Sequence, residues 1–324
     1  MSIKETQDVN IKDEKLVLII LPVAILSVST AAIFIRVAQE TIPSITIASY
    51  RLIIASLILF PFTIKKTYRE MKDLNSRSIR LIIISGFLLA LHFASWIISL
   101  EFTNVISSVV LVTTTPIWVA AISPWLIKER VPRRFLLGLV LAFLGMVLIS
   151  FSNTGLFSSW NMNEIFIKDK LVIQGNLLAL LGAFCAAGYV VIGRVLRKQL
   201  STGSYSLSVY SIAGAVLVIF AVVSQEQSLK INLNELKWLI LLALIPQVIG
   251  HSLINWSLGI MPAYYVAISL LGEPIGSTIL AIFILKEIPT ISEIISAGII
   301  LLGIFIAING SRNTSDQGRK PSHT

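Results

Sequence analysis

Long apolar runs constrain the fold of this chain more than any other feature of its sequence. A helix needs about 20 mostly apolar residues to cross the hydrocarbon core of a bilayer. Ten runs come close to that length: roughly 16–36, 44–64, 79–100, 104–127, 135–152, 173–194, 204–224, 238–258, 262–285 and 292–309. The alternating pattern of barrel strands is absent. The sequence therefore predicts an all-α integral membrane protein with ten transmembrane helices.

The composition agrees with a bilayer as the solvent. Hydrophobic residues make up 55% of the 324 residues, charged residues make up 13%, and the mean hydropathy is +0.85. That leaves too little polar surface for a water-soluble globule of this length. Cys185 is the only cysteine, so neither an intrachain disulfide nor a thiolate metal cluster can form.

The chain also contains the same phrase twice, at a fixed offset of 158 residues. The matching pairs are Ser99-Leu100 with Ser257-Leu258, Lys128-Glu129 with Lys286-Glu287, and Thr115-Pro116 with Glu273-Pro274. A period this long indicates a duplicated half-protein, and five spans in each half force the second copy to enter the membrane the other way up. We therefore expect two inverted five-helix repeats, at 16–151 and 173–309.

Lys and Arg lie mainly on one side of the predicted membrane. With the N-terminus inside, that side holds the tails 1–15 and 310–324 and the basic stretches 65–80, 128–134 and 194–198. The other side holds the linker 152–172 and fewer basic residues: Arg36, Lys168, Lys170, Lys230, Lys237 and Lys286. Because cytoplasmic loops carry the excess of Lys and Arg, both termini are predicted to be cytoplasmic, in a cell membrane such as the bacterial inner membrane. The basic residues behind the net charge of +9 are therefore expected to set the membrane orientation and to contact anionic membrane lipid. Nucleic acid is not an expected partner.

Motifs of an enzyme or an ATP-driven pump are absent. The sequence has no GxxxxGK[ST] loop, no HExxH and no GxSxG. We therefore predict no catalytic residue, no cofactor and no metal. Two hypotheses from other classes stay open: a channel, and an intramembrane enzyme that uses His92, His251 and Glu273 as an acid–base set. Duplication within one chain favours a carrier over a channel.

Three stretches carry a resemblance to a known family. They are AAIFIRVA at 31–38, the Tyr50-Arg51 pair in the second span, and LLGEPIGSTILAIFILKE at 270–287. Together with the ten-span duplication, they resemble the EamA branch of the drug/metabolite transporter superfamily over 16–151 and 173–309. The resemblance implies a secondary carrier or exporter of small metabolites, with a central cavity and alternating access. Members of the family handle amino acids, drugs, nucleotide precursors and other solutes.

Two deep charges are the main candidate site residues. Glu273 lies about eleven residues into its span, roughly 16 Å deep, and Arg51 lies roughly 10 Å deep. Charges at such depths are costly and mark a cavity or a pathway. Gly272 and Pro274 flank Glu273 and predict a helix break there, with Pro116 at the matching place in the first half. The two charges are expected to form either a structural ion pair or a site for substrate and protons.

Other polar and aromatic residues lie at similar depths. His92 and His251 occupy matching positions in the third and eighth spans, with Trp96 and Asn255 one turn later and Tyr50 beside Arg51. Each is expected either to line the path or to form an ordinary helix contact. We expect a secondary transporter that exports a small metabolite such as an amino acid, with Glu273 exchanging a proton for a cationic group. The alternative is efflux of cationic drugs, bound by Glu273 and aromatic walls.

Small residues spaced four apart predict close helix contacts. Gly138 with Ala142 and Gly182 with Ala186 follow this pattern, and Gly298 and Gly303 lie near the C-terminal end. Small side chains let helix backbones approach each other in a membrane. We expect these residues to be part of the scaffold.

Overall fold

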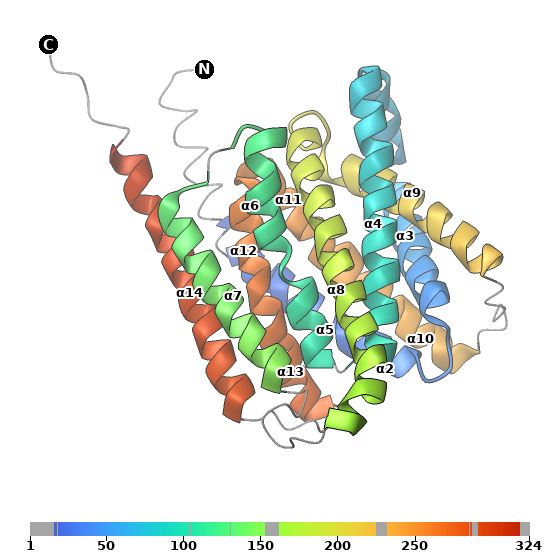
Figure 1. The fold of residues 1–324 in the computed structure, drawn as a ribbon. Helices are drawn as coiled ribbons and strands as arrows, with labels where there is room; N and C mark the ends of the chain where they lie inside the picture. Colours follow the sequence, from blue (N-terminus) through green and yellow to red (C-terminus); the bar gives the residue numbers. More distant parts are fainter. Residues whose placement is uncertain are drawn as a thin grey trace, which may run out of the picture.

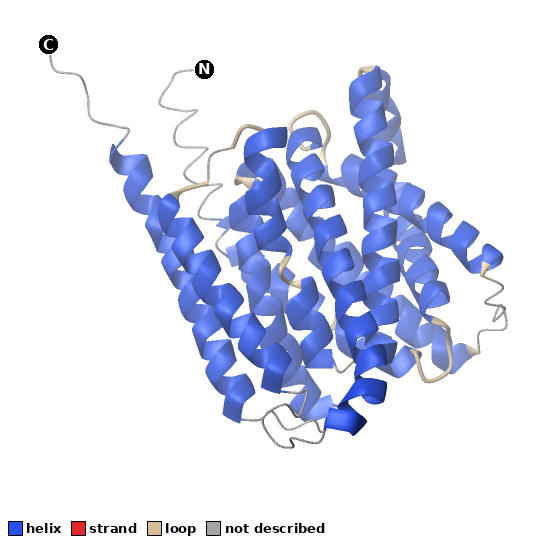
Figure 2. Ribbon diagram, viewed as in Figure 1, coloured by secondary structure: helices blue, strands red, loops and turns tan. Residues whose placement is uncertain are grey.

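The computed structural model describes residues 16–17, 19–103, 105–129, 131–152, 162–224, 232–284, 286 and 291–317. Every regular element of these segments is a helix (Figure 2). Eight stretches are long and apolar enough to cross a membrane: Ile19–Ala38, Ser44–Lys72, Ser76–Phe102, Ser107–Leu126, Lys170–Leu196, Thr202–Val223, Leu233–Ile260 and Ala263–Ile284. The predicted spans 135–152 and 292–309 coincide with two further helices, and the described apolar stretch of the second, Ile294–Ala307, is shorter. The chain is thus an all-helical, multi-pass membrane protein.

The helices follow one another with short connections. After a helical stretch at 19–29 they are α2 (Ala31–Ala38), α3 (Ser44–Lys72), α4 (Ser76–Phe102), α5 (Val105–Val112), α6 (Thr115–Leu126), α7 (Arg133–Ser152), α8 (Met162–Leu196), α9 (Thr202–Val223), α10 (Leu233–Leu242), the π-helix η1 (Ala243–His251), α11 (Ser252–Ile260), α12 (Ala263–Ser269), the 3₁₀ turn η2 (Leu270–Gly272), α13 (Glu273–Ile284) and α14 (Ile291–Gln317). Side-chain caps mark some of the starts. The Asn75 side chain accepts from Ser78 N at 2.8 Å before α4, and Asn232 forms a capping box with Glu235 before α10.

Three helix pairs make the most extensive contacts in the bundle: α7 with α14, α4 with α8, and α3 with α9 (Figure 1). Backbones approach most closely between α7 and α14. A Cβ added at Gly303 would lie 2.6 Å from Ala142 N and 2.6 Å from Gly138 O. The predicted contact of Gly138, Ala142 and Gly303 is confirmed. Gly298 does not take part, because a Cβ there would meet nothing within 4 Å.

Two of the predicted spans are interrupted where the sequence places a proline. The span 104–127 divides into α5 and α6 at residues 113–114, with Pro116 in the first turn of α6. The span 262–285 divides into α12 and α13 at η2, which ends at Gly272 just before Glu273 and Pro274. Proline is tolerated in the first turn of a helix, where its missing N–H would lack a partner anyway. Each of the two prolines thus lies in the first turn of the helix that follows an interruption.

Residues related by the offset of 158 make the same backbone and side-chain contacts. Arg36 Nη1 donates to Leu100 O at 2.5 Å, and its counterpart Arg194 Nη1 donates to Leu258 O at 2.8 Å. Gln39 Nε2 donates to Ile97 O at 2.7 Å, and Arg197 Nε donates to Asn255 O at 3.0 Å. Lys128 and Lys286 also share a left-handed backbone, with φ of 56° and 58°. The repeated phrase therefore corresponds to repeated structure.

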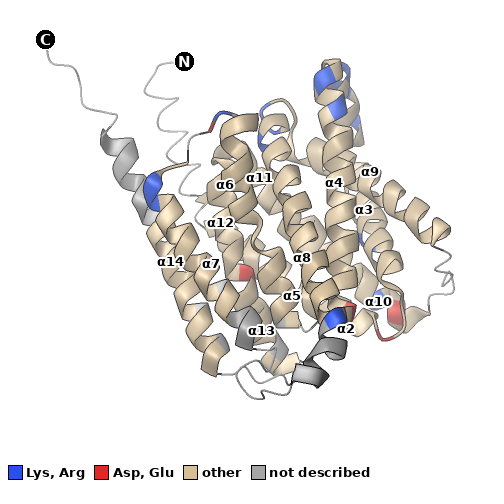
Figure 3. Cartoon of the chain, viewed as in Figure 1, with Lys and Arg blue, Asp and Glu red and all other residues tan. Residues whose placement is uncertain are grey.

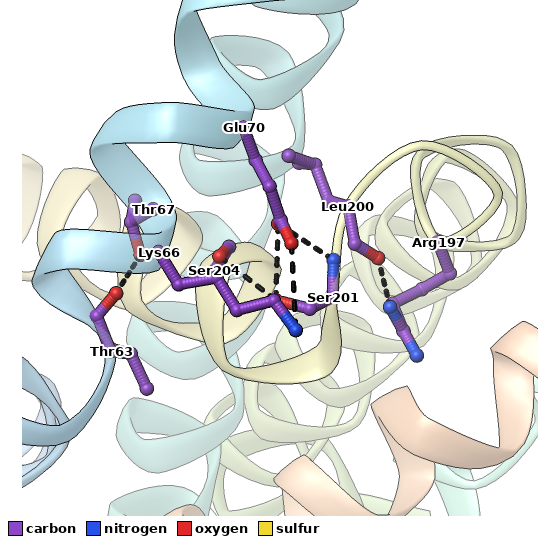
Figure 4. A network of polar contacts seen from close by, with 8 residues as sticks. All are labelled: Thr63, Lys66, Thr67, Glu70, Arg197, Leu200, Ser201 and Ser204. Atoms are coloured by element: carbon purple, nitrogen blue, oxygen red, sulfur yellow. Dashed lines mark hydrogen bonds and ion pairs between the residues drawn. The ribbon is translucent and has the colours of Figure 1, made fainter.

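Lys and Arg gather at one end of the bundle, which we call the basic end. It holds the α3–α4 hairpin and the α6–α7 and α8–α9 connections (Figure 3). Glu70 at the end of α3 accepts from Ser201 N at 2.8 Å and from Ser201 Oγ at 3.0 Å, just before α9 begins (Figure 4). Glu129 forms an ion pair with Arg194 at 2.9 Å and accepts from Ala263 N at 3.2 Å. Two carboxylates of the first half thus bind the second half at this end.

The opposite end joins the two halves differently. There Arg36, Gln39 and Ser44 bond within the first half, the last of them to the Glu101 carboxylate. Phe34 of α2 packs on Trp238 of α10, with ring centroids 5.9 Å apart. Among the described residues, no ion pair joins the halves at this end. Contact between the halves is therefore mainly apolar here.

Candidate functional site

A narrow cavity lies between the two halves of the bundle. Its polar lining comes from Arg51 on α3, His92 and Trp96 on α4, Thr113 between α5 and α6, Thr115 on α6, Tyr189 on α8, His251 on η1 and Glu273 on α13. Its volume is about 50 Å³, which holds a few water molecules. A metabolite would therefore enter only if the walls moved apart.

Arg51 is fully buried in the cavity wall. Its Nε donates to Gln247 Oε1 at 2.7 Å, and its Cζ lies 4.1 Å from the centre of the Phe93 ring. Both terminal nitrogens, Nη1 and Nη2, are buried without a hydrogen-bond partner. A buried guanidinium without partners at its end is costly, so this group is suited to a ligand that supplies acceptors.

Glu273 reaches the cavity from the interrupted helix. It is the first residue of α13, directly after η2, and its side chain is buried. Ser29 Oγ donates to the Glu273 carbonyl at 3.2 Å, and Ser277 Oγ donates to Ser29 O at 3.1 Å, so the start of α13 is attached to the first half. Within the described segments, the Glu273 carboxylate has no ion-pair partner within 4.0 Å.

The hypothesis of a direct Arg51–Glu273 ion pair is therefore wrong for this conformation. Both residues line the same cavity, but Arg51 is turned toward Gln247 and Phe93. Similar depth in the membrane brought them to one level and did not fix the direction of either side chain. The site holds two opposite charges that are separate from each other.

The predicted histidines and Trp96 lie together in the cavity wall. His92 stacks on Trp96 with ring centroids 5.9 Å apart, and its Nδ1 bonds Gly182 O at 2.9 Å. His251 meets Phe93 edge to face at 5.3 Å, while His251 Nδ1 and Trp96 Nε1 are buried without partners. The structure thus brings the two histidines to one cavity, and their role in transport stays a prediction.

Asn255 and Tyr50 do not line the cavity. Asn255 is buried behind the wall, where its Oδ1 accepts from Tyr189 OH at 2.5 Å and its Nδ2 donates to Ser206 Oγ at 3.0 Å. Tyr50 is partly buried and packs against the apolar core. A direct contact of Asn255 with a ligand would need a different conformation. In this conformation Asn255 holds the Tyr189 side chain by a hydrogen bond.

Gln247 is the main site residue that sequence reasoning missed. It is fully buried on η1, next to Pro246, and it bonds Arg51. Tyr189 and Phe93 were missed as well, because an isolated aromatic residue in an apolar span carries no signal of its own. The signal for Gln247 was available: a lone amide beside a proline in mid-span resembles the Glu273-Pro274 pair.

The fold and the cavity define a class of protein. This is a multi-pass helical membrane protein with interrupted helices around a central cavity that holds opposite charges, as in carriers for small solutes. The EamA-like transporter family model matches residues 15–151 and 173–309. The chain belongs to the EamA-like transporter family.

Relatives and a solved structure agree with that assignment. An uncharacterized transporter of Archaeoglobus fulgidus is 23% identical over 276 residues, which covers 85% of this chain and 91% of the relative. The uncharacterized transporter YetK of Bacillus subtilis is 23% identical over 314 residues, covering 94% and 91% of the two chains. A crystal structure aligns with a TM-score of 0.72 at 16% identity, over 93% of this chain and 99% of that chain, and so shares the fold.

Proposed function

We propose that this protein is a secondary transporter that exports a small metabolite, such as an amino acid, by alternating access. The observation that carries the proposal is the cavity that Arg51 and Glu273 share without pairing. Arg51 is a suitable partner for a carboxylate, and Glu273 for an ammonium group. An amino acid carries both groups.

We further propose ten transmembrane helices arranged as two inverted repeats, 16–151 and 173–309, joined by an external linker at 152–172. Matching contacts of Arg36 and Arg194 support the duplication. Packing of α3 on its counterpart α9, and of α7 on its counterpart α14, supports a pseudo-two-fold axis between the halves. The basic end is then cytoplasmic, together with both tails, by the positive-inside rule.

Alternating access would use the two helix breaks. Residues at or beside both interruptions line the cavity, namely Thr113 and Thr115 at the first and Leu270 and Glu273 at the second. Short half-helices can tilt without disturbing the rest of the bundle. Glu273 is the carboxylate of this lining, which also holds His92 and His251, and it can take up a proton as it releases a cationic group. Substrate and proton would then occupy the same carboxylate in turn, which couples export to the proton gradient.

The decisive experiment compares metabolites released by cells with and without the protein, followed by flux in proteoliposomes. We expect saturable, proton-gradient-dependent export of at least one amino acid. Glu273→Gln should abolish that export at unchanged membrane levels, while the exposed Glu40→Gln should leave it intact. Identical metabolite profiles with and without the protein would contradict the proposal, and flux that never saturates would favour a channel.

A second candidate is efflux of organic cations. It is favoured by the unpaired Glu273 carboxylate in the same wall as the aromatic rings of Trp96 and Tyr189. Tetraphenylphosphonium is a suitable probe in the same proteoliposomes. Transport of this cation that survives Arg51→Gln would favour this candidate over amino acid export, since only an amino acid needs the guanidinium.

A further inference from the structure

The π-helix η1 places one amide beside the only guanidinium in the cavity lining. Gln247 is fully buried, and Pro246 lies next to it within η1. Long π-helical segments are rare and often occur at functional sites. The same segment ends at His251, so η1 brings two side chains to the Arg51 region of the cavity.

The bond to Gln247 decides which edge of Arg51 is free. A guanidinium offers five N–H donors in a rigid fork. Nε, on the side edge, donates to Gln247 Oε1 at 2.7 Å. The Phe93 ring covers one face of the guanidinium, with its centre 4.1 Å from Cζ. The end edge, formed by Nη1 and Nη2, is buried in the cavity wall and unpartnered. Two parallel donors on one edge match the two oxygens of a carboxylate.

The same bond contributes to the separation of the two charges. Gln247 and the Phe93 ring are the described contacts that hold Arg51 away from Glu273, and attraction in a low-dielectric cavity would draw a guanidinium released by Gln247 toward the carboxylate. A direct ion pair would satisfy both groups and leave no fork for a ligand. Gln247 is neutral, so it fixes Arg51 without cancelling its charge.

We infer that Gln247 is a positioning residue that presents the Arg51 fork to the cavity and thereby makes the site select solutes with a free carboxylate over the corresponding amides. This deepens the proposed function and rests on the cavity being the substrate site. The solute class is the carboxylates, with amino acids as the members that also satisfy Glu273.

The test uses amino acids paired with their own amides as probes. An amino acid amide keeps the side chain and the ammonium group, but it lacks the carboxylate charge and has an NH2 donor in place of one acceptor oxygen. The affinity of each common amino acid and of its amide is measured by thermal stabilisation and titration. The measurements use the purified full-length protein in nanodiscs. We expect at least one acid to bind roughly tenfold or more tightly than its amide, which is about 1.4 kcal/mol.

Gln247→Met removes the acceptor at similar length. We expect the acid-over-amide ratio to fall to within about twofold, with amide affinity unchanged, and Arg51→Gln to give the same ratio. The matched control is Gln199→Met, since Gln199 accepts from Ser78 Oγ at 2.9 Å away from the cavity. That variant should keep the wild-type ratio. A purely structural role of Gln247 would lower stability and both affinities together and would leave the ratio unchanged.

The outcomes separate this inference from the transport proposal. Equal affinity for acids and amides in the wild type, no stabilisation by any acid, or an unchanged ratio in Gln247→Met would each overturn the inference. Acid-selective binding without flux in proteoliposomes would overturn the transport proposal and leave the inference standing. Transport of amides as fast as that of the corresponding acids would overturn the inference and leave the transport proposal standing.

Discussion

Replacing Gly303 by alanine measures how tightly α7 and α14 are packed. A Cβ at this position would lie 2.6 Å from Ala142 N and 2.6 Å from Gly138 O, and both atoms belong to helix backbone that cannot turn aside as a side-chain tip can. Overpacking by one methyl group against such neighbours typically costs about 1–3 kcal/mol. In Gly303→Ala this clash should therefore act on the free energy of unfolding with a steric cost of that size.

Gly298→Ala is the matched control on the same helix. A Cβ there meets nothing within 4 Å, so the substitution adds only the helix propensity of alanine, up to about 1 kcal/mol, which both variants share. The difference between the two variants isolates the steric term. Since 1 kcal/mol corresponds to roughly 2 °C for a chain of this size, the melting temperatures should differ by roughly 2–6 °C. Thermal unfolding in nanodiscs, followed by tryptophan fluorescence, measures this. Equal melting temperatures would refute the assignment of α7–α14 as the closest helix contact.

Three further predictions concern charge and topology. Glu129→Gln should lower the free energy of unfolding by about 1–2 kcal/mol, because the half-buried Arg194 loses its ion pair while a hydrogen bond can remain. Thermal unfolding measures this change. An unchanged melting temperature would show that the pair is only a surface contact. Reporter fusions should place 65–78 in the cytoplasm and 153–172 outside, and a cytoplasmic 153–172 would exclude inverted repeats. Glu273→Gln should stay folded by size-exclusion chromatography yet lose the dependence of transport on the proton gradient, and a wild-type pH profile would rule out proton exchange at this carboxylate.

Features that depend on local sequence were predictable. Pro116 and Pro274 lie in the first turn of a new helix, where a residue without an N–H is tolerated, whereas Pro61 lies inside α3 without ending it. The all-helical fold follows from the apolar runs. The close packing at Gly138 and Gly303 could be predicted from the small size of these residues. The physical cause of each of these features lies within a few neighbouring residues of the sequence.

Features that depend on direction around a helix axis were not predictable from depth. Tyr50 and Arg51 are adjacent, so their side chains point about 100° apart on the helix, and only Arg51 faces the cavity. The same geometry separates Arg51 from Glu273, whose matching depths had made an ion pair plausible. The amide of Gln247 beside Pro246 was visible in the sequence, but its contact with Arg51 was not, because the π-helical turn that aims it there is a tertiary feature.

The unequal ends of the bundle have a thermodynamic consequence for any cycle that opens them in turn. Opening the basic end breaks the Glu129–Arg194 ion pair and the bonds of Glu70 to Ser201, and dissolved salt weakens such charged contacts. Opening the other end separates apolar contacts such as Phe34 on Trp238, and newly wetted apolar surface raises the heat capacity. The two half-cycles would therefore respond to different variables. Ionic strength would govern opening of the basic end, and the rate of opening at the opposite end would show a curved dependence on temperature.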